Sequence, residues 1–345
     1  MKRNRILFLL LIFTVVGCNK YTDFKSEVFQ PKGIPDVNQN FSYMHFINEH
    51  EGYLFGSIQH WSNMTNKKSE NLNSPHRFTE EAIIYKTMDG GENWILIDSL
   101  CNSSFYNSGV YYDGCIYIQL KNSKKDYGNN LVRFKLADNN ITVLKYNFER
   151  MGRIWINGNK IAIDYLNKGI SKILFTDSDF KKIDSINCNK VFMSNVLTVR
   201  KQSVALTYDY QLYNITKNKT YNFRDSVYQD ITLKNKNEIF ILGSMNNTVK
   251  IFTFNIATNR IKKIGNIPDY HIVTELQSNN NVISCFVGNI IGMFVFYDLL
   301  YSVDEGKTWK IRKLEIDCMV HPSCLIGNIL YISSGNNMMQ KIVLK

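Results

Sequence analysis

Most of the short motifs that mark common enzyme classes are missing from this sequence of 345 residues. It has neither the G-x-S-x-G turn that exposes a nucleophilic serine nor a glycine-rich loop that would bind phosphate. Its six histidines form no H-E-x-x-H motif, and the cysteine spacings match no zinc site. We therefore predict no catalytic residues of these kinds, no metal site and no cofactor.

Helix signals and concentrated charge are also scarce. Short runs of Ile, Val, Phe, Tyr and Leu are instead broken by clusters of Asn, Gly, Asp and Lys, which is the pattern of strands and turns in an all-β protein. The net charge is +11, but the lysines are spread through expected loops, without the basic element and interleaved aromatic residues of a nucleic-acid reader. We expect no nucleic-acid partner.

The N-terminus carries the most specific signal. Three basic residues within 2–5 precede an uninterrupted apolar run at 6–16, which is too short to span a bilayer. The run is followed by Gly-Cys18 and resembles the lipobox of bacterial lipoproteins, in which the cysteine is acylated and becomes the first residue. We predict a signal peptide at 1–17 and a lipid-anchored Cys18. An ordinary signal peptide with an incidental cysteine, or a short core helix, is the alternative.

Lipid attachment would place the protein in the cell envelope. Several acyl chains on one N-terminus anchor a protein stably, because each buried methylene contributes about 0.8 kcal/mol. Asn19, Lys20 and Tyr21 follow the cysteine without an acidic cluster, so the periplasmic side and the cell surface both stay open. Loss of the signal peptide removes three basic residues and leaves a net charge of +8. Such a surface tolerates acidic glycans or anionic lipids.

A turn signal followed by an apolar strand recurs along the rest of the chain. Seven copies occur, at Gly52-Tyr-Leu-Phe-Gly, Gly114-Cys-Ile-Tyr-Ile, Asn159-Lys-Ile-Ala-Ile, Gln202-Ser-Val-Ala-Leu, Asn237-Glu-Ile-Phe-Ile, Asn281-Val-Ile-Ser-Cys and Asn328-Ile-Leu-Tyr-Ile. Most steps lie near 43 residues, the length of four short strands, which is typical of a β-propeller blade. The sequence predicts a single all-β propeller with seven four-stranded antiparallel blades; six or eight blades are the alternatives.

The ends of this repeat suggest how the chain is divided. The first step is longer than the others, and we assign the excess to an insertion at 58–80. The last copy leaves room for only about three strands before the C-terminus, so the segment 24–29 could supply an outer strand and close the ring. We therefore predict an N-terminal tether with a closing strand at 18–40 and a propeller at 41–345.

Two segments share the pattern Ser/Thr-x-Asp-x-Gly-x-x-Trp. The residues that match it are Thr87, Asp89, Gly91 and Trp94 in the first segment, and Ser302, Asp304, Gly306 and Trp309 in the second. The two aspartates lie 215 residues apart, which is five periods of the repeat. The segments resemble the Asp-box, or BNR repeat, of β-propellers that include sialidases and other exo-acting glycan hydrolases, sortilin-type receptors and photosystem assembly factors.

The resemblance implies a structural role for the motif. In this family the box forms the turn between the third and fourth strands of a blade, away from the catalytic face. We expect the aspartate to accept hydrogen bonds from backbone amides, the glycine to take a positive φ, and the tryptophan to pack between neighbouring blades. A calcium or carbohydrate contact is the alternative role of Asp89 and Asp304.

The sialidases of this family have features that the chain lacks. Their Arg-Ile-Pro segment has its nearest match at 33–35, where Gly33 replaces the arginine. None of the eight arginines that follow the signal peptide stands in a recognisable triad context, so a sialic-acid carboxylate has no evident bidentate partner. Sialidase activity is therefore disfavoured. Another glycosidase would need two carboxylates across the pocket, which one sequence does not place.

Ligand binding is expected on the face formed by the second-to-third and fourth-to-first strand connections, which are free to vary in a propeller. The insertion at 58–80 is one such connection, and long loops of compact domains are commonly functional. Aromatic rings with cationic neighbours suit a sugar or a peptide segment. The candidate ligand-binding residues are Trp61, His76, Arg77, Tyr127, Arg150, Arg153 and His271. For each of them, a solvated loop residue without function is the alternative.

These features favour a monomeric, membrane-anchored and non-catalytic propeller that binds a protein or a glycan of the cell envelope. An assembly factor for envelope complexes, or an immunity-type inhibitor of a neighbour's toxin, would fit. The alternative is an exo-acting glycan hydrolase related to sialidases with a rearranged site. Two carboxylates roughly 5–10 Å apart in the central pocket would favour the enzyme, and a flat, basic face would favour binding.

Overall fold

The described residues consist of strands and their connections. The computed structural model describes residues 25–35, 39–61, 78–122, 129–145, 148, 150–188, 190–192, 196–221, 227–291, 294–316, 322–334 and 337–345. This part of the chain contains no helix, and therefore none that could span a membrane.

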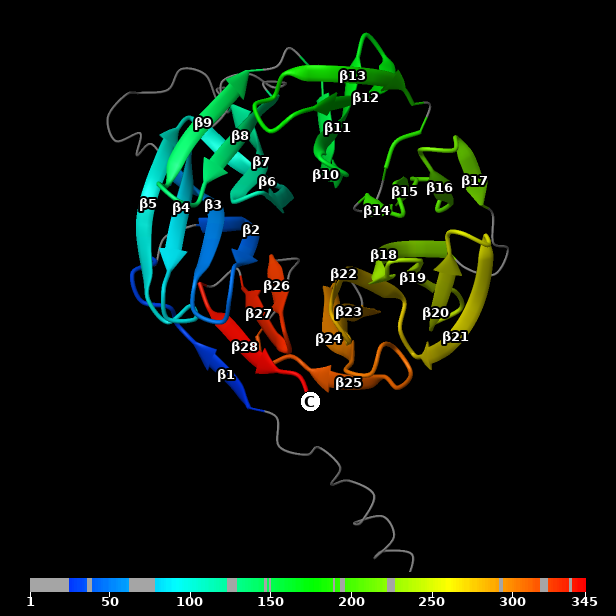
Figure 1. Ribbon diagram of the computed structural model, residues 1–345. Helices are drawn as coiled ribbons and strands as arrows, with labels where there is room; N and C mark the ends of the chain where they lie inside the picture. Colours follow the sequence, from blue (N-terminus) through cyan, green and yellow to red (C-terminus); the bar gives the residue numbers. More distant parts are fainter. Residues whose placement is uncertain are drawn as a thin grey trace, which may run out of the picture.

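The strands form seven four-stranded antiparallel sheets around a central axis, which is a β-propeller (Figure 1). From the inside outwards, blade 1 contains β2 (Gln39–Phe46), β3 (Gly52–Trp61), β4 (Phe78–Thr87) and β5 (Trp94–Cys101). Blade 2 contains β6 (Ser103–Tyr112), β7 (Cys115–Asn122), β8 (Asn129–Lys135) and β9 (Asn140–Lys145). Blade 3 contains β10 (Arg150–Asn157), β11 (Lys160–Asn167), β12 (Ile170–Thr176) and β13 (Lys182–Asn187).

The remaining four blades complete the ring. Blade 4 contains β14 (Leu197–Val199), β15 (Gln202–Leu206), β16 (Leu212–Asn214) and β17 (Lys219–Tyr221). Blade 5 contains β18 (Val227–Asn235), β19 (Glu238–Ser244), β20 (Thr248–Asn255) and β21 (Arg260–Pro268). Blade 6 contains β22 (Ile272–Asn279), β23 (Val282–Ile291), β24 (Phe294–Ser302) and β25 (Lys310–Lys313). Blade 7 contains β26 (Ser323–Ile326), β27 (Ile329–Ser333), β28 (Met339–Val343) and β1 (Ser26–Phe29). The predicted fold of seven four-stranded blades is confirmed.

Blade 7 is built from both ends of the chain. Strand β1 pairs with β28 in antiparallel register, from Ser26 opposite Ile342 to Phe29 opposite Met339. The Gln340 side chain donates a hydrogen bond to the Ser26 hydroxyl at 2.9 Å across this pair. The segment that the sequence offers as a closing strand therefore occupies the outer position of blade 7, and pairing of the two ends fastens the ring.

Each of the seven repeated segments forms the second strand of a blade. These strands are continuous apolar runs because both of their faces are covered by neighbouring blades. Tyr53, Leu54 and Phe55 in β3, for example, have no exposed surface. Tyr53 and Phe55 pack against the rings of Phe105 and Phe134 in blade 2. The hydrophobic core is thus divided into layers between the blades.

Strand pairing extends into the segment that the sequence assigns to an insertion. Ile58–Trp61 at the end of β3 pair with Phe78–Glu81 at the start of β4. Within this extension of the hairpin, His60 contacts Glu81 at 3.0 Å. Residues 62–77, the remainder of the expected insertion, lie outside the described part of the chain. Strand β2 begins at Gln39, two residues before the predicted propeller boundary.

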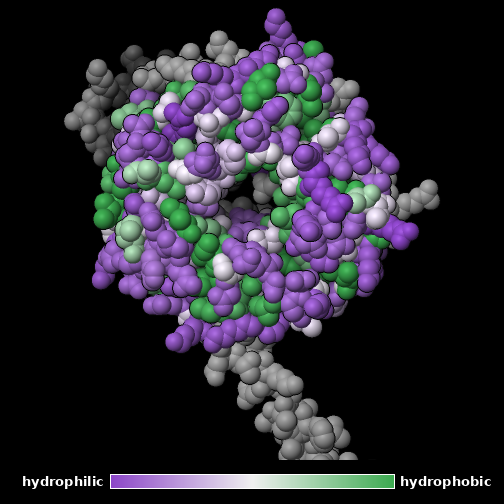
Figure 2. All heavy atoms as spheres, in the orientation of Figure 1, coloured by the Kyte–Doolittle hydropathy of each residue, from purple (hydrophilic) through white to green (hydrophobic). Residues whose placement is uncertain are grey.

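The propeller has two unlike faces. The turns between first and second strands, and between third and fourth strands, lie at one end of every blade, which we call the turn face. The second-to-third connections and the links from one blade to the next lie at the other end, which we call the loop face. Viewed along the axis, the molecule has a mostly hydrophilic surface and an opening at its centre (Figure 2).

Candidate functional site

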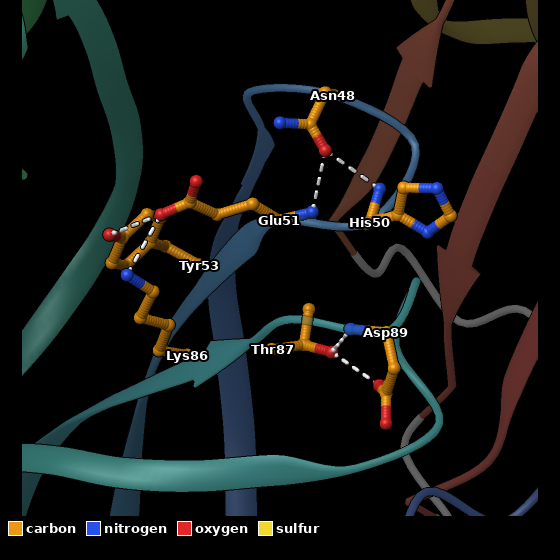
Figure 3. A network of polar contacts seen from close by, with 7 residues as sticks. All are labelled: Asn48, His50, Glu51, Tyr53, Lys86, Thr87 and Asp89. Carbon is orange, nitrogen blue, oxygen red and sulfur yellow. Dashed lines mark hydrogen bonds and ion pairs between the residues drawn. The ribbon is translucent and has the colours of Figure 1, made fainter.

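The segment Thr87–Trp94 forms the third-to-fourth turn of blade 1, on the turn face. The Asp89 Oδ1 atom accepts a hydrogen bond from the Thr87 hydroxyl at 2.9 Å (Figure 3) and another from the Asn93 amide at 2.9 Å. The Thr87 Oγ1 atom accepts the Gly91 amide at 3.0 Å, and Gly91 takes a φ of 94°. Asp89 therefore organises the backbone of the turn.

The segment Ser302–Trp309 repeats this arrangement in blade 6. The Asp304 Oδ1 atom accepts hydrogen bonds from the Ser302 hydroxyl and the Thr308 amide, both at 2.8 Å. The Thr308 amide and hydroxyl lower the pKa of Asp304 to about 2, because both bonds favour the charged carboxylate. Such a group is a turn residue and not a proton donor. Within the described residues, no three His, Cys, Asp or Glu side chains lie close enough to hold a metal ion.

The tryptophans of the two turns each contact a neighbouring blade. The Trp94 indole is 2% exposed, donates a hydrogen bond to the Gly91 carbonyl at 2.8 Å, and belongs to a cluster that includes Tyr331 of blade 7. The Trp309 ring meets Phe240 of blade 5 edge to face, with 6.3 Å between ring centres. Both turns therefore stabilise blade contacts on the turn face and contribute no candidate binding site.

The candidate site lies at the other end of the axis. The inner strands of five blades have a break in their pairing register in the half nearer the loop face, and such bulges commonly occur beside functional sites. The breaks lie between Phe41 and Tyr43, Phe105 and Gly109, Met151 and Ile154, Tyr228 and Asp230, and Thr274 and Gln277. We use the name collar for five polar residues at the bulges of blades 3, 5 and 6. They are Arg153, Asp164, Gln229, Asp230 and Glu275.

Asp164 faces the bulge of blade 3. It lies on β11 opposite the break in β10, and its Oδ1 atom accepts a hydrogen bond from the Arg153 amide. Burial raises the pKa of Asp164 to about 6, against the opposing effects of this amide and of the Arg153 and Arg150 charges. The carboxyl group is therefore partly buried beside two arginines, and the effect of burial on its pKa exceeds theirs.

Asp230 joins blade 5 to blade 6. Its Oδ1 atom accepts the Ile231 amide at 2.9 Å, and its Oδ2 atom accepts the Leu276 amide of the next blade at 2.7 Å. Burial raises the pKa of Asp230 to about 6, although these amides and the charge of Arg153 lower it. Arg153 therefore acts electrostatically on acids of two different blades.

Glu275 joins blade 6 to blade 7. Its backbone has a φ of 52°, which is uncommon for a residue other than glycine, asparagine or aspartate. Its Oε2 atom accepts the hydroxyl of Ser323 at 2.6 Å. Burial raises the pKa of Glu275 to about 7, and the negative charge of Asp230 raises it further. The two carboxyl groups thus share one electrostatic environment.

The collar has two chemical capacities. Carboxyl groups that titrate near neutral pH can exchange a proton with a bound molecule or accept its hydroxyl and amino groups. The same groups also satisfy backbone amides of the bulges, which is a structural role. Gln229 has the structural role: its Oε1 atom accepts the Val273 amide at 2.6 Å, and its Nε2 atom donates to the Ser244 hydroxyl at 2.9 Å.

Three of the seven candidate ligand residues have described side chains, and all three lie towards the loop face. Arg150 begins β10, and Arg153, which belongs to the collar, lies in the first half of the same strand. His271 directly precedes β22; its Nδ1 atom lies 3.1 Å from the Asn289 Oδ1 atom, and its carbonyl accepts a bond from Gln229. Trp61 ends β3, and nothing is described of its side chain. The other candidates, His76, Arg77 and Tyr127, lie outside the described residues.

The three acids of the collar were not predicted from the sequence. Asp164 and Asp230 stand next to apolar residues of their strands, in Ile163-Asp164-Tyr165 and Asp230-Ile231, whereas Glu275 lies in the mixed segment Thr274-Glu275-Leu276. An acid beside apolar residues of a strand needs a buried partner, so this position was the signal that could have identified Asp164 and Asp230. Asp164 meets Arg153 within one hairpin, 11 positions away, whereas the partners of Asp230 and Glu275 lie 46 and 48 positions away and meet them only in the folded ring.

The loop face also exposes large apolar side chains beside the collar. The β23–β24 hairpin continues past Gly288, the last residue that pairs with β22, and its exposed part carries Ile290, Ile291, Val295 and Phe296. Ile290 and Phe296 are 52% and 56% exposed. The corresponding connections of blades 4 and 5 expose Tyr208, Tyr210 and Met245. Clustered exposed apolar surface of this kind commonly marks an interaction site.

The fold and this central site define the class of the protein as a seven-bladed β-propeller. Solved structures support the fold. A manganese complex of oligogalacturonate lyase is 10% identical, with a TM-score of 0.64 over 93% of this chain and 96% of that chain. Virginiamycin B lyase from Staphylococcus aureus is 12% identical, with a TM-score of 0.59 over 94% and 100% of the two chains. The propeller domain of the Trilobed protease from Pyrococcus furiosus is 10% identical, with a TM-score of 0.55 over 85% and 90%.

Sequence comparison adds no narrower family. No family model matches the chain, and no curated protein matches its sequence. At identities this low, the structural likeness shows the propeller fold and carries no activity over to this chain.

Proposed function

We propose that this protein is a lipid-anchored propeller of the bacterial cell envelope that binds an envelope protein through its loop face. The observation that carries the proposal is the group of exposed apolar side chains on the connections of blades 4, 5 and 6. A monomer seldom exposes several large apolar residues together unless a partner covers them. The turn face, in contrast, consists of short turns fixed by internal hydrogen bonds.

The anchor is supported by the sequence. The basic start, the apolar run and Cys18 occur in the order of a bacterial lipoprotein signal. The turns at Asp89 and Asp304 resemble the Asp-box, and propellers with this motif include receptors and assembly factors. A non-catalytic binding function agrees with that resemblance. Acylation would keep the protein in the envelope as a monomer facing its partner.

The collar would give such a partner polar contacts in addition to the exposed apolar residues of blades 4, 5 and 6. Arg150 and Arg153 supply fixed positive charge, and the neighbouring carboxyl groups supply acceptors. A peptide segment inserted at the axis would meet both. Aromatic and charged residues at the centre of a contact surface commonly dominate binding energy.

A matched pair of variants tests the proposal. Ile290→Ser with Phe296→Ser removes two exposed apolar side chains from the loop face. Ile95→Ser with Leu96→Ser removes two side chains of similar exposure, 66% and 51%, from the outer strand β5. We expect an envelope protein that is retained by the wild type to be retained by the β5 variant and lost with the hairpin variant. Equal retention by both variants, or no specific partner in envelope extracts, would contradict the proposal.

One observation favours a second candidate, a glycan hydrolase. Asp230 is buried and Glu275 partly buried, and both carboxyl groups have raised pKa values in a shared environment, as acid and base catalysts often have. The test is hydrolysis of a glycoside panel by the wild type, Asp230→Asn and Glu275→Gln. Turnover that both substitutions abolish, in folded protein, would establish the enzyme. Absence of turnover in the wild type would leave binding as the function.

A further inference from the structure

The turn face has an uneven charge distribution. Each described turn of this face is considered together with the last residue of the strand before it and the first residue of the strand after it. In blades 4 to 7 these turns contain eight basic residues, which we call the basic arc: Arg200, Lys201, Lys217, Lys219, Lys236, Arg260, Lys307 and Lys310. They contain three acidic residues, Glu238, Asp304 and Glu305. One half of the turn face is therefore strongly positive.

The other half is acidic. The turns of blades 1 to 3 contain four basic residues, Lys135, Lys160, Lys181 and Lys182. They contain eight acidic residues, Glu49, Glu51, Asp89, Glu92, Asp113, Asp138, Asp177 and Asp179. The uniform spread of lysine expected from the sequence therefore becomes a polarised surface in the folded ring, because consecutive blades place their turns side by side.

The basic arc is solvated and open to an external partner. Arg200, Lys201, Lys217, Lys236 and Arg260 are exposed and form no ion pair with any described residue. In the acidic half, by contrast, short pairs such as Lys135 with Asp138, at 3.4 Å, neutralise part of the charge. In the positive half Lys234 pairs with Glu238 at 3.1 Å, which leaves these five basic residues of the arc without an ion pair among the described residues.

The tether leaves the propeller at this same face. Ser26 starts β1 opposite Ile342, at the place where the other blades have a third-to-fourth turn. The Lys25 carbonyl accepts the Val343 amide at 3.2 Å, which fixes the start of the blade. Figure 1 shows β1 and the C-terminus close together at the rim, next to blade 6. The exit point therefore adjoins the basic arc.

The tether is short. Seven residues, 19–25, separate Cys18 from the first residue of β1. A fully extended chain covers about 3.5 Å per residue, so the exit point stays within about 25 Å of the acylated cysteine. An acyl anchor at Cys18 would thus hold the edge of the turn face close to the lipid headgroups, and would leave the loop face directed away from them.

We infer that the basic arc rests on anionic lipid headgroups of the membrane that holds the anchor. The inference depends on the proposed acylation of Cys18 and goes beyond it by assigning an orientation. A lipid chain and a polybasic surface reinforce one another, because each supplies a separate contribution to membrane affinity. The acidic half would be repelled, so the propeller tilts onto blades 4 to 7. The loop face is then presented to its partner.

Vesicle partitioning of the chain 19–345, which contains all seven blades, tests the arc without the acyl group. We expect binding to vesicles of phosphatidylcholine with one quarter phosphatidylglycerol, little binding to pure phosphatidylcholine, and loss of binding in high salt. Each basic residue near an anionic surface contributes about a factor of five in affinity. Arg200→Gln, Lys201→Gln and Lys236→Gln together should therefore lower partitioning on the order of 100-fold.

The matched control carries the same change in charge on the acidic half. Lys135→Gln, Lys181→Gln and Lys182→Gln together should leave partitioning within about threefold, because these residues lie in the outer turns of blades 2 and 3, among Asp138, Asp177 and Asp179. An equal fall in both triple variants, or equal binding to neutral and anionic vesicles, would overturn the inference. Binding to a DNA duplex as tight as to anionic vesicles, and lost in the same variant, would show a general polyanion surface and would also overturn it.

Photo-crosslinking of the acylated full-length protein in the same vesicles tests the orientation. A photoreactive residue in place of Lys236, on the turn face, should yield lipid adducts, and one in place of Ile290, on the loop face, should yield none. Adducts at both positions, or at Ile290 alone, would contradict an orientation with the turn face towards the membrane. The two proposals fail separately. A cellular protein without acyl groups on Cys18 refutes the anchor, whereas an acylated protein with the reverse crosslinking pattern refutes only the arc.

Discussion

Replacement of Trp94 by alanine is expected to lower the free energy of unfolding by about 3–5 kcal/mol, the range for removing a buried tryptophan ring. The ring is 2% exposed and lies in the layer between blades 1 and 7, where the two ends of the chain meet. It packs edge to face on Phe46, with 6.1 Å between ring centres, and Phe46 in turn stacks on Tyr331 of blade 7 at 3.9 Å. A cavity here would loosen the joint that fastens the ring.

Two further variants separate the parts of this effect. Trp94→Phe keeps most of the buried area but loses the hydrogen bond from the indole to the Gly91 carbonyl, so a loss of about 1–3 kcal/mol is expected. Trp309→Ala should cost less than Trp94→Ala, because the Trp309 side chain is only partly buried. The second turn also lies away from the joint between the chain ends.

The assay is chemical unfolding followed by fluorescence and circular dichroism at matched protein concentration. The order of the three losses is the decisive result. If Trp94→Ala lost less than 1 kcal/mol, or no more than Trp309→Ala, the interblade packing assigned to Trp94 would be refuted.

Three other predictions concern the turns, the collar and the anchor. Gly306→Ala should destabilise the protein by about 1–3 kcal/mol, because Gly306 has a φ of 81° and a Cβ atom would lie 2.8 Å from the Phe240 ring. Gly114→Ala should cost about 1 kcal/mol in the same unfolding measurement, because Gly114 has a φ of 71° but no atom within 4 Å of the added Cβ. The folded state raises the pKa of Glu275 to about 7, so protonation stabilises the fold, and this stability is lost as pH rises from about 4 to 7. Relative to the wild type, Glu275→Gln should therefore gain about 3 kcal/mol in free energy of unfolding as the pH rises from 4.5 to 7.5. Burial lowers the pKa of His45 to about 4, which gives the opposite pH dependence, but this contribution is the same in both proteins and cancels in their difference. A difference that does not change with pH would contradict the burial of Glu275. Cys18→Ser should move the protein out of the membrane fraction and abolish acylation in an intact-mass measurement, and unchanged membrane association would contradict the lipid anchor.

Local patterns in the sequence were enough to predict the fold. The second strand of each blade is buried on both faces, so it appears as a short apolar run after a turn signal, such as Asn237-Glu-Ile-Phe-Ile. The turns at Asp89 and Asp304 were also predictable, because their hydrogen bonds join residues no more than four positions apart. Both signals depend on neighbours in the chain and therefore repeat visibly with the blades.

The candidate site and the polarised turn face were decided by the tertiary structure. Asp230 binds an amide 46 positions away, and Glu275 binds a hydroxyl 48 positions away, so no local pattern pairs them. The basic arc arises in the same way, because lysines and arginines that are scattered along the chain come together only when the ring arranges consecutive turns on one face. The sequence by itself determined how each blade folds, since that depends on burial and turn chemistry within about 40 residues. Which side chains of different blades meet depended on the closure of the ring.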